Sequence, residues 1–175
     1  MKVLVPLAED FEEIEAVTVI DILRRAGIEV VSAGLKKGPV RASRGVVVIP
    51  DMDLGEALES GYDMLVLPGG AGTKHLREDH RIIELARAMM SNGRHVAAIC
   101  AAPTVLAKAG ILGRATAFPG TLETMGFENE GVPVLRDGNV ITSRGPGTAM
   151  DFALEIVETL KGTEKRQEVE SGLMR

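Results

Sequence analysis

The chain has 175 residues, enough for one domain with a complete hydrophobic core, and its 45% hydrophobic and 26% charged residues are typical of a globular protein. A net charge of −5 and the absence of tryptophan argue against general or specific nucleic-acid binding. No apolar run reaches the roughly 18 residues that a membrane helix needs. The single cysteine fits a reducing compartment, so we expect a cytoplasmic protein with no membrane association.

The first half of the chain alternates apolar runs with amphipathic segments. Residues 2–7 predict a buried strand rather than a signal peptide, because acidic residues follow the run. Residues 10–27 predict a helix. Its apolar residues at helical spacing are Ile14, Val17, Ile20, Ile22 and Leu23. The other elements expected in this half are a strand over 28–34, an extended excursion over 40–54 that includes Pro50, and a short helix over 55–60.

The second half continues the alternation without a repeat or a linker. The expected strands cover 62–72, 95–100 and 114–119, and the first of them runs into a glycine turn. A strand–turn–strand unit is expected over 134–143. The expected helices cover 79–93, 102–112 and 145–162, followed by a polar tail. This pattern predicts a single three-layer α/β domain over residues 1–175 with a mostly parallel sheet. Ligands of such sheets bind beyond the carboxyl ends of the strands.

The only cysteine, Cys100, lies where a buried strand meets a helix, in "RHVAAICAAPTVLAKAGIL". A sharp strand-to-helix turn exposes its central residue above the sheet, as in a nucleophile elbow. The positive end of the following helix is expected to lower the pKa of such a thiol. The alternative is a small buried core residue, a common role of free cysteine. This stretch alone favours neither interpretation.

The stretch "LPGGAG" places Gly69 and Gly70 directly after another buried strand. Their backbone N–H groups could approach a ligand and, beside Cys100, form an oxyanion hole with the N–H of Ala101. An ordinary turn is the alternative. A phosphate loop is excluded because no Lys-Ser or Lys-Thr pair follows the glycines.

Acidic residues open the first helix. Four of them suit a solvated helix start: Glu9, Asp10, Glu12 and Glu13. Glu15 differs, because it lies between Ile14 and Ala16, near the apolar positions. Desolvation there would raise the pKa of its carboxyl, and a protonated Glu15 could donate a hydrogen bond to a cysteine sulfur. From the residues alone, a partly exposed acid is the favoured interpretation.

The three histidines are poorly placed for catalysis by a cysteine–histidine pair. His95 precedes its strand, at the opposite end of the sheet from Cys100, and no histidine follows it. His75 could approach the glycine turn, although a surface role is favoured. With one cysteine, these histidines show no metal-ligand spacing, so we expect no metal. A cysteine peptidase or amidase is the least favoured function.

Four stretches, "EEIEAVTVIDILRRAGIEV", "YDMLVLPGG", "VAAICAAPTVLA" and "ITSRGPGTAMDFALEIVE", together resemble the ThiJ/PfpI superfamily and its DJ-one/YajL branch. They occur in the order of the family and cover nearly the whole chain. The resemblance implies a flavodoxin-like three-layer α/β sandwich, similar to class I glutamine amidotransferases, that forms a homodimer and uses no cofactor.

The resemblance also implies roles for particular residues. Cys100 matches the nucleophilic, oxidation-prone cysteine of the family, and Glu15 matches its partner acid. Gly69 and Gly70 match its backbone donors, with Ala101 beside them. Five further residues match positions near the pocket or the dimer contact: Arg25, Arg44, Phe118, Arg144 and Pro146. Phe118 stands where some relatives have histidine, which places acid–base duty on Glu15, and Ala101 replaces the histidine of the peptidase branch.

The function implied by this resemblance is a cofactor-independent glyoxalase or deglycase that protects against carbonyl and oxidative stress. Its substrates would be methylglyoxal, glyoxal or their adducts on proteins and nucleotides. The alternative is a non-enzymatic redox sensor or a redox-regulated chaperone that works through oxidation of Cys100.

Overall fold

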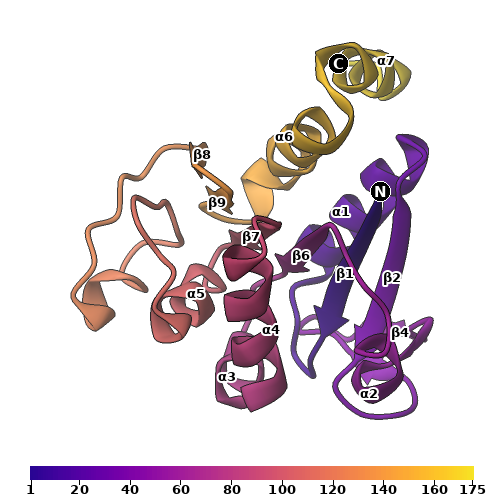
Figure 1. The fold of residues 1–175 in the computed structure, drawn as a ribbon. Helices are drawn as coiled ribbons and strands as arrows, with labels where there is room; N and C mark the ends of the chain where they lie inside the picture. The colour runs from indigo at the N-terminus through magenta and orange to yellow at the C-terminus, as the bar shows by residue number, and fades with distance from the viewer.

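The computed structural model describes residues 1–175, which form a seven-stranded sheet between two layers of helices (Figure 1). The strands of this sheet are β1 (Lys2–Leu7), β2 (Glu29–Gly34), β5 (Met52–Asp53), β6 (Met64–Leu67), β7 (His95–Ile99), β8 (Val134–Asp137) and β9 (Val140–Ser143). They lie in the order β5-β2-β1-β6-β7-β9-β8, and only β8 runs antiparallel to its neighbour. The prediction of a flavodoxin-like α/β sandwich with a mostly parallel sheet is confirmed.

The helices divide between the two faces of the sheet. One face is covered by α1 (Glu13–Arg25), α6 (Ala149–Lys161) and α7 (Thr163–Gly172). The other is covered by α2 (Leu54–Ala57), α3 (Thr73–Glu78), α4 (His80–Ser91) and α5 (Pro103–Ala109). Two short 3-10 turns, η1 (Glu123–Met125) and η2 (Pro146–Thr148), and a hairpin of β3 (Val40–Arg41) with β4 (Val47–Val48) complete the fold. None of these helices combines the length and apolar character that crossing a membrane requires.

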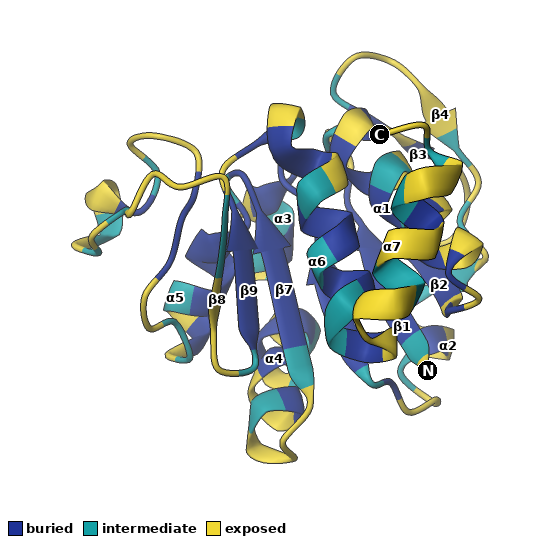
Figure 2. Cartoon of the chain, turned by 90° about the horizontal axis from the view of Figure 1, so that it is seen from above, coloured by how far each residue is buried: buried dark blue, intermediate teal, exposed yellow.

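The central strands are buried on both faces because their side chains alternate between two hydrophobic cores. In β1, Val3 and Val5 pack into the core beneath α1 and α6, whereas Leu4 packs into the core on the opposite side. Figure 2 shows the interior strands in the buried class and β8 more exposed at the edge. This double burial is why residues 2–7 read as a continuous apolar run rather than as an alternating one.

The strand predicted over 114–119 is wrong. The N–H of Thr116 donates to Oγ1 of Thr142 at 3.0 Å, and the N–H of Ala117 donates to Oδ1 of Asn129 at 3.1 Å. Side-chain acceptors therefore take the place of a strand ladder. The segment still passes close to the end of β7, because the N–H of Phe118 donates to the carbonyl oxygen of Cys100 at 2.8 Å.

The buried face of α1 also differs from the predicted one. The structure buries Ala16, Val19, Ile22 and Leu23, but leaves Ile14 and Val17 at 55% and 48% exposure. The helix therefore has two apolar sides, and only one of them faces the core. Sequence spacing could not separate them, because both sides satisfy a helical period.

Candidate active site

Cys100 occupies the turn between the end of β7 and the start of α5. Its φ is +65°, a left-handed conformation that costs a non-glycine residue about 1–3 kcal/mol. Two backbone hydrogen bonds hold it there: its own N–H donates to the carbonyl of Ser143 at 2.9 Å, and the N–H of Phe118 donates to its carbonyl. The local geometry is the strand-to-helix elbow predicted from the sequence, at the carboxyl edge of the sheet.

Glu15 reaches this turn from the first turn of α1. Its side chain is fully buried, and Oε2 accepts a hydrogen bond from the N–H of Gly69 at 2.7 Å. The carboxyl lies close enough to the Cys100 thiol for each group to shift the pKa of the other, and its Oε1 is buried without a hydrogen-bond partner. Burial raises the pKa of Glu15 from 4.5 to about 7, so a large fraction of the carboxyl is protonated at neutral pH. The alternative of a partly exposed acid does not hold.

The thiol is harder to ionise than the sequence suggested. Burial, followed by the charge of Glu15, raises the pKa of Cys100 from 9.0 to about 12, although the N–H groups of Gly70 and Ala101 act in the opposite direction. The expectation of a lowered pKa is therefore contradicted. The contribution of Glu15 requires an ionised carboxylate, so protonating Glu15 removes that part of the increase in the pKa, whereas the larger part that comes from burial remains.

The three backbone N–H groups predicted to form an oxyanion hole do not all have the same partner. Because the N–H of Gly69 is bonded to Glu15, it is not free to serve an oxyanion, which corrects its predicted assignment. The N–H groups of Gly70 and Ala101 remain beside the sulfur. Gly69 is needed for another reason: a Cβ there would lie 2.6 Å from Cβ of Cys100 and 2.8 Å from Oε2 of Glu15. Only glycine lets the three residues approach this closely.

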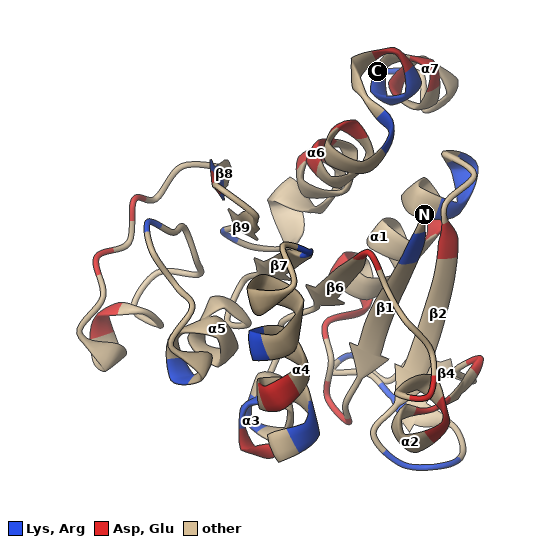
Figure 3. Cartoon of the chain, viewed as in Figure 1, with Lys and Arg blue, Asp and Glu red and all other residues tan.

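Glu13 was expected to be solvated and is instead buried. It accepts a hydrogen bond from the N–H of Arg44 at 2.6 Å and from Oγ of Ser43 at 3.0 Å. Figure 3 shows the acidic residues gathered where β1 leads into α1. No pattern in the sequence indicates that one of them holds the β3–β4 hairpin against α1, because that hairpin meets the helix only in the tertiary fold.

The remaining predicted residues lie at different distances from the thiol. Arg25 pairs with Asp21 at 2.7 Å on the last turn of α1. It follows Glu15 by ten residues, which is about 15 Å along a helix, so it does not line a pocket at Cys100. Phe118, Arg144 and Pro146 come together in a hollow of about 440 Å³ beside the elbow.

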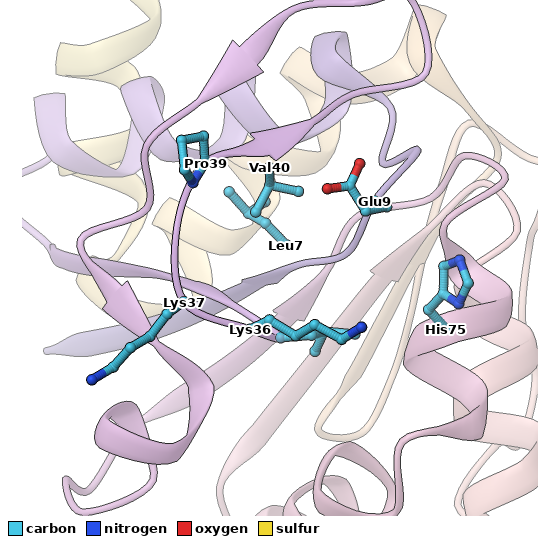
Figure 4. Close-up of a pocket in the computed structure, with 8 residues that line it drawn as sticks. Leu7, Glu9, Lys36, Lys37, Pro39, Val40 and His75 are labelled. Atoms are coloured by element: carbon cyan, nitrogen blue, oxygen red, sulfur yellow. The ribbon is translucent and has the colours of Figure 1, made fainter.

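Neither His75 nor His95 contacts the thiol. His95 begins β7, whereas Cys100 follows the end of that strand. His75 lines a separate hollow of about 240 Å³ together with Glu9, Lys36 and Lys37, and Cys100 does not contribute to this hollow (Figure 4). The polar groups that shift the pKa of the thiol come from Glu15, Gly70 and Ala101, and no histidine is among them. A cysteine–histidine pair is therefore not formed.

The chain is similar to known proteins over most of its length. The model of the DJ-1/PfpI family matches residues 1–159. Protein dj-1beta of Drosophila melanogaster is 46% identical over 179 residues, covering 98% of this chain and 95% of the relative. The crystal structure of Drosophila melanogaster DJ-1beta superposes with a TM-score of 0.94 at 44% identity, covering 99% of this chain and 97% of that one.

Two further relatives carry enzymatic names. Glutathione-independent glyoxalase DJR-1.2 of Caenorhabditis elegans is 40% identical over 161 residues, covering 90% of this chain and 87% of the relative. Deglycase PYRAB04690 of Pyrococcus abyssi is 35% identical over 166 residues, covering 92% of this chain and 100% of the relative. With the family match over most of the chain, these similarities identify the protein as a member of the DJ-1/PfpI family.

Proposed function

We propose that the protein is a cofactor-independent glyoxalase and deglycase that acts on methylglyoxal, glyoxal or their adducts. The observation that carries the proposal is the fully buried Glu15 carboxyl, which accepts the Gly69 N–H through Oε2 and lies beside the Cys100 thiol with Oε1 unpartnered. A carboxyl with a pKa of about 7 can both accept and donate a proton at neutral pH. Two relatives named as a glyoxalase and a deglycase support the same reaction class.

The first step is addition of the Cys100 sulfur to the aldehyde carbon of methylglyoxal. The thiol proton passes to the ionised form of Glu15, which is present at neutral pH beside the protonated form, as the carbon–sulfur bond forms, and this avoids a free thiolate in a buried site. The carbonyl oxygen gains the negative charge and is stabilised by backbone N–H groups, of which those of Gly70 and Ala101 lie beside the sulfur. Return of the proton to this oxygen gives a hemithioacetal and leaves Glu15 ionised.

The second step moves a hydrogen between neighbouring carbons. Ionised Glu15 removes the proton from the carbon that bears sulfur, and the electron pair moves onto the adjacent carbonyl to give an enediolate. The proton on the first oxygen then moves to the second, negatively charged oxygen. Glu15 then protonates the second carbon, which gives the lactate thioester of Cys100. Water hydrolyses the thioester and regenerates the thiol, so the net reaction is methylglyoxal plus water to lactic acid. Aldehyde released from a glycation adduct enters at the same first step.

We infer that the functional unit is a homodimer. Ile14 and Val17 on α1 are exposed apolar side chains, and Val46, Val47 and Ile49 on the hairpin segment are exposed as well. The hydrogen bonds from Ser43 and Arg44 to Glu13 hold the hairpin against α1, so these two exposed groups adjoin. Exposed apolar side chains on two segments that are bonded together suit a self-complementary contact with a second copy. Arg44, beside this surface, remains a candidate dimer contact.

A redox function is the second candidate, and the protonated state of Glu15 supports it. Peroxide converts a thiolate to sulfenic acid and then to sulfinic acid. A neutral Glu15 could donate a hydrogen bond to an oxygen of the sulfinate. With one cysteine in the chain, no internal disulfide can form, so such a sensor or redox-regulated chaperone would signal through the sulfinate itself.

The decisive experiment measures lactate formed from methylglyoxal without glutathione. We expect turnover by the wild type, none by Cys100→Ala, and at least a roughly 100-fold loss in Glu15→Gln. Asp21→Asn, the same kind of change on the exposed side of α1, is the control and should keep full activity. Activity retained by Cys100→Ala would refute the nucleophile. No lactate from the wild type, with a gain of two oxygens on Cys100 after mild peroxide, would favour the redox function.

A further inference from the structure

A groove of about 340 Å³ adjoins the thiol on the side of α3. Gly70 and Ala101, whose N–H groups lower the pKa of the Cys100 thiol, belong to its lining. One wall comes from α3, with Thr73, Lys74 and Arg77, and the rest comes from α5 and from the segment that follows Phe118. A ligand bound covalently at the sulfur can therefore extend into this groove. A three-carbon dicarbonyl such as methylglyoxal is too small to fill it.

The charges in the groove have one sign. Lys74 and Arg77 line it, and no acidic residue does. Neither side chain forms an ion pair or a hydrogen bond within the chain. Figure 3 shows basic residues on α3, in a chain whose net charge is −5. Two cations without acidic partners beside a reactive sulfur create a local field that attracts anions.

Thr73 adds a second, independent observation. It is 4% exposed and lines the groove, and its hydroxyl is buried without a hydrogen-bond partner. Buried polar groups without a partner are rare in native proteins and mark places where an ion or a water completes the bonding. The other hydroxyls are already used: that of Thr104 donates to the carbonyl of Ala101 at 2.6 Å, and that of Thr121 donates to the carbonyl of Phe118 at 2.7 Å.

We propose that this groove binds a phosphate or carboxylate group of the substrate. The preferred substrate is then a small aldehyde or dicarbonyl that carries an anionic group, with its carbonyl carbon at Cys100 and its anion at Lys74 and Arg77. The inference rests on the proposed function for the identity of the reaction. The binding of the anion is a property of the groove and can be measured without turnover.

The first test uses alkylation of Cys100 by two reagents that form the same carbon–sulfur bond and release iodide. Iodoacetate is an anion and iodoacetamide is neutral. The measured quantity is the rate constant for iodoacetate divided by that for iodoacetamide, normalised by the same ratio for the free thiol 2-mercaptoethanol. We expect this normalised ratio to be roughly ten in the wild type. Lys74→Gln with Arg77→Gln should return it to about one, whereas Lys36→Gln with Lys37→Gln should leave it unchanged.

The two double variants change the net charge equally, so they separate the groove from the overall field. Lys36 and Lys37 line the other hollow (Figure 4). A wild-type ratio at or below one, or the same ratio after both changes on α3, would overturn the proposal. A failure of the proposed function would show itself differently, as absence of lactate from methylglyoxal with the alkylation ratio still high.

The second test identifies the anion by reversible protection of Cys100 against iodoacetamide. Glycolaldehyde, glycolaldehyde phosphate and glyoxylate each offer an aldehyde to the sulfur, but only the last two carry a charge. We expect at least one of the two anionic aldehydes to protect Cys100 at about tenfold lower concentration than glycolaldehyde does. The one that protects at the lower concentration identifies the preferred anionic group. Lys74→Gln with Arg77→Gln should abolish the advantage. Equal protection by all three compounds would refute an anion subsite.

Discussion

Replacing Glu15 by glutamine should make the stability of the protein less sensitive to pH. Glutamine keeps the size of the side chain and an oxygen that can accept the Gly69 N–H, but it cannot ionise. In the wild type, the carboxyl is fully buried and its pKa is raised from 4.5 to about 7. The unfolded chain holds this proton only up to its ordinary pKa, so folding and ionisation oppose each other above that value.

The size and sign of the effect follow from which state holds the proton. Between pH 4.5 and about 7 the folded protein retains a proton that the unfolded chain has released, so wild-type stability falls as pH rises through this window. At about 1.4 kcal/mol for each pKa unit, the full loss is about 3 kcal/mol above pH 7. Glu15→Gln does not suffer this loss. Its stability relative to the wild type should therefore increase by about 3 kcal/mol between pH 4.5 and pH 8.5.

Urea unfolding of both proteins at pH 4.5 and pH 8.5, in the presence of a reductant, measures this difference. Far-ultraviolet circular dichroism is the suitable probe, because the chain has no tryptophan and one tyrosine. Every other titrating group is shared by the two proteins and cancels in the comparison. If the stability difference between the wild type and Glu15→Gln is the same at both pH values, Glu15 titrates normally. The proposed role of its protonated form would then be refuted.

Three further changes test the packing of the site and the exposed surface. Gly69→Ala should reduce lactate formation at least roughly 100-fold and lower the melting temperature, because its Cβ would meet Cys100 at 2.6 Å; a fully active variant would contradict this close approach. Phe152→Ala removes a fully buried ring and should cost about 3–5 kcal/mol in urea unfolding, and a cost below about 1 kcal/mol would show that the core can close around the gap. Ile14→Asp should turn the proposed dimer into a monomer in sedimentation equilibrium, whereas a dimer that survives it would place the contact elsewhere.

Much of the architecture was predictable because buried parallel strands have an unambiguous signature. Residues 2–7 and 95–100 read as strands from their apolar runs, and the structure places β1 and β7 there. The error over 114–119 has a physical origin. Its alternating residues suit an extended chain, but its N–H groups bond to side chains of Thr142 and Asn129 that lie far along the sequence.

The short helix α3 was also missed. It spans only Thr73–Glu78, and Leu76 is the one large apolar side chain that it buries. A helix of this length cannot display a full period, so periodicity gives no signal. Its position matters for the groove, because Lys74 and Arg77 lie on it.

The sequence alone determined that Cys100 stands at the carboxyl end of a buried strand, because an apolar run ends there and a proline-initiated helix follows. Only the tertiary structure decided which polar groups surround it. Glu15 is buried against the thiol and Glu13 against the hairpin, although both lie on the same helical turn. Burial and hydrogen bonding depend on segments that are distant along the chain, and these segments meet only when the sheet brings its strand ends to one edge.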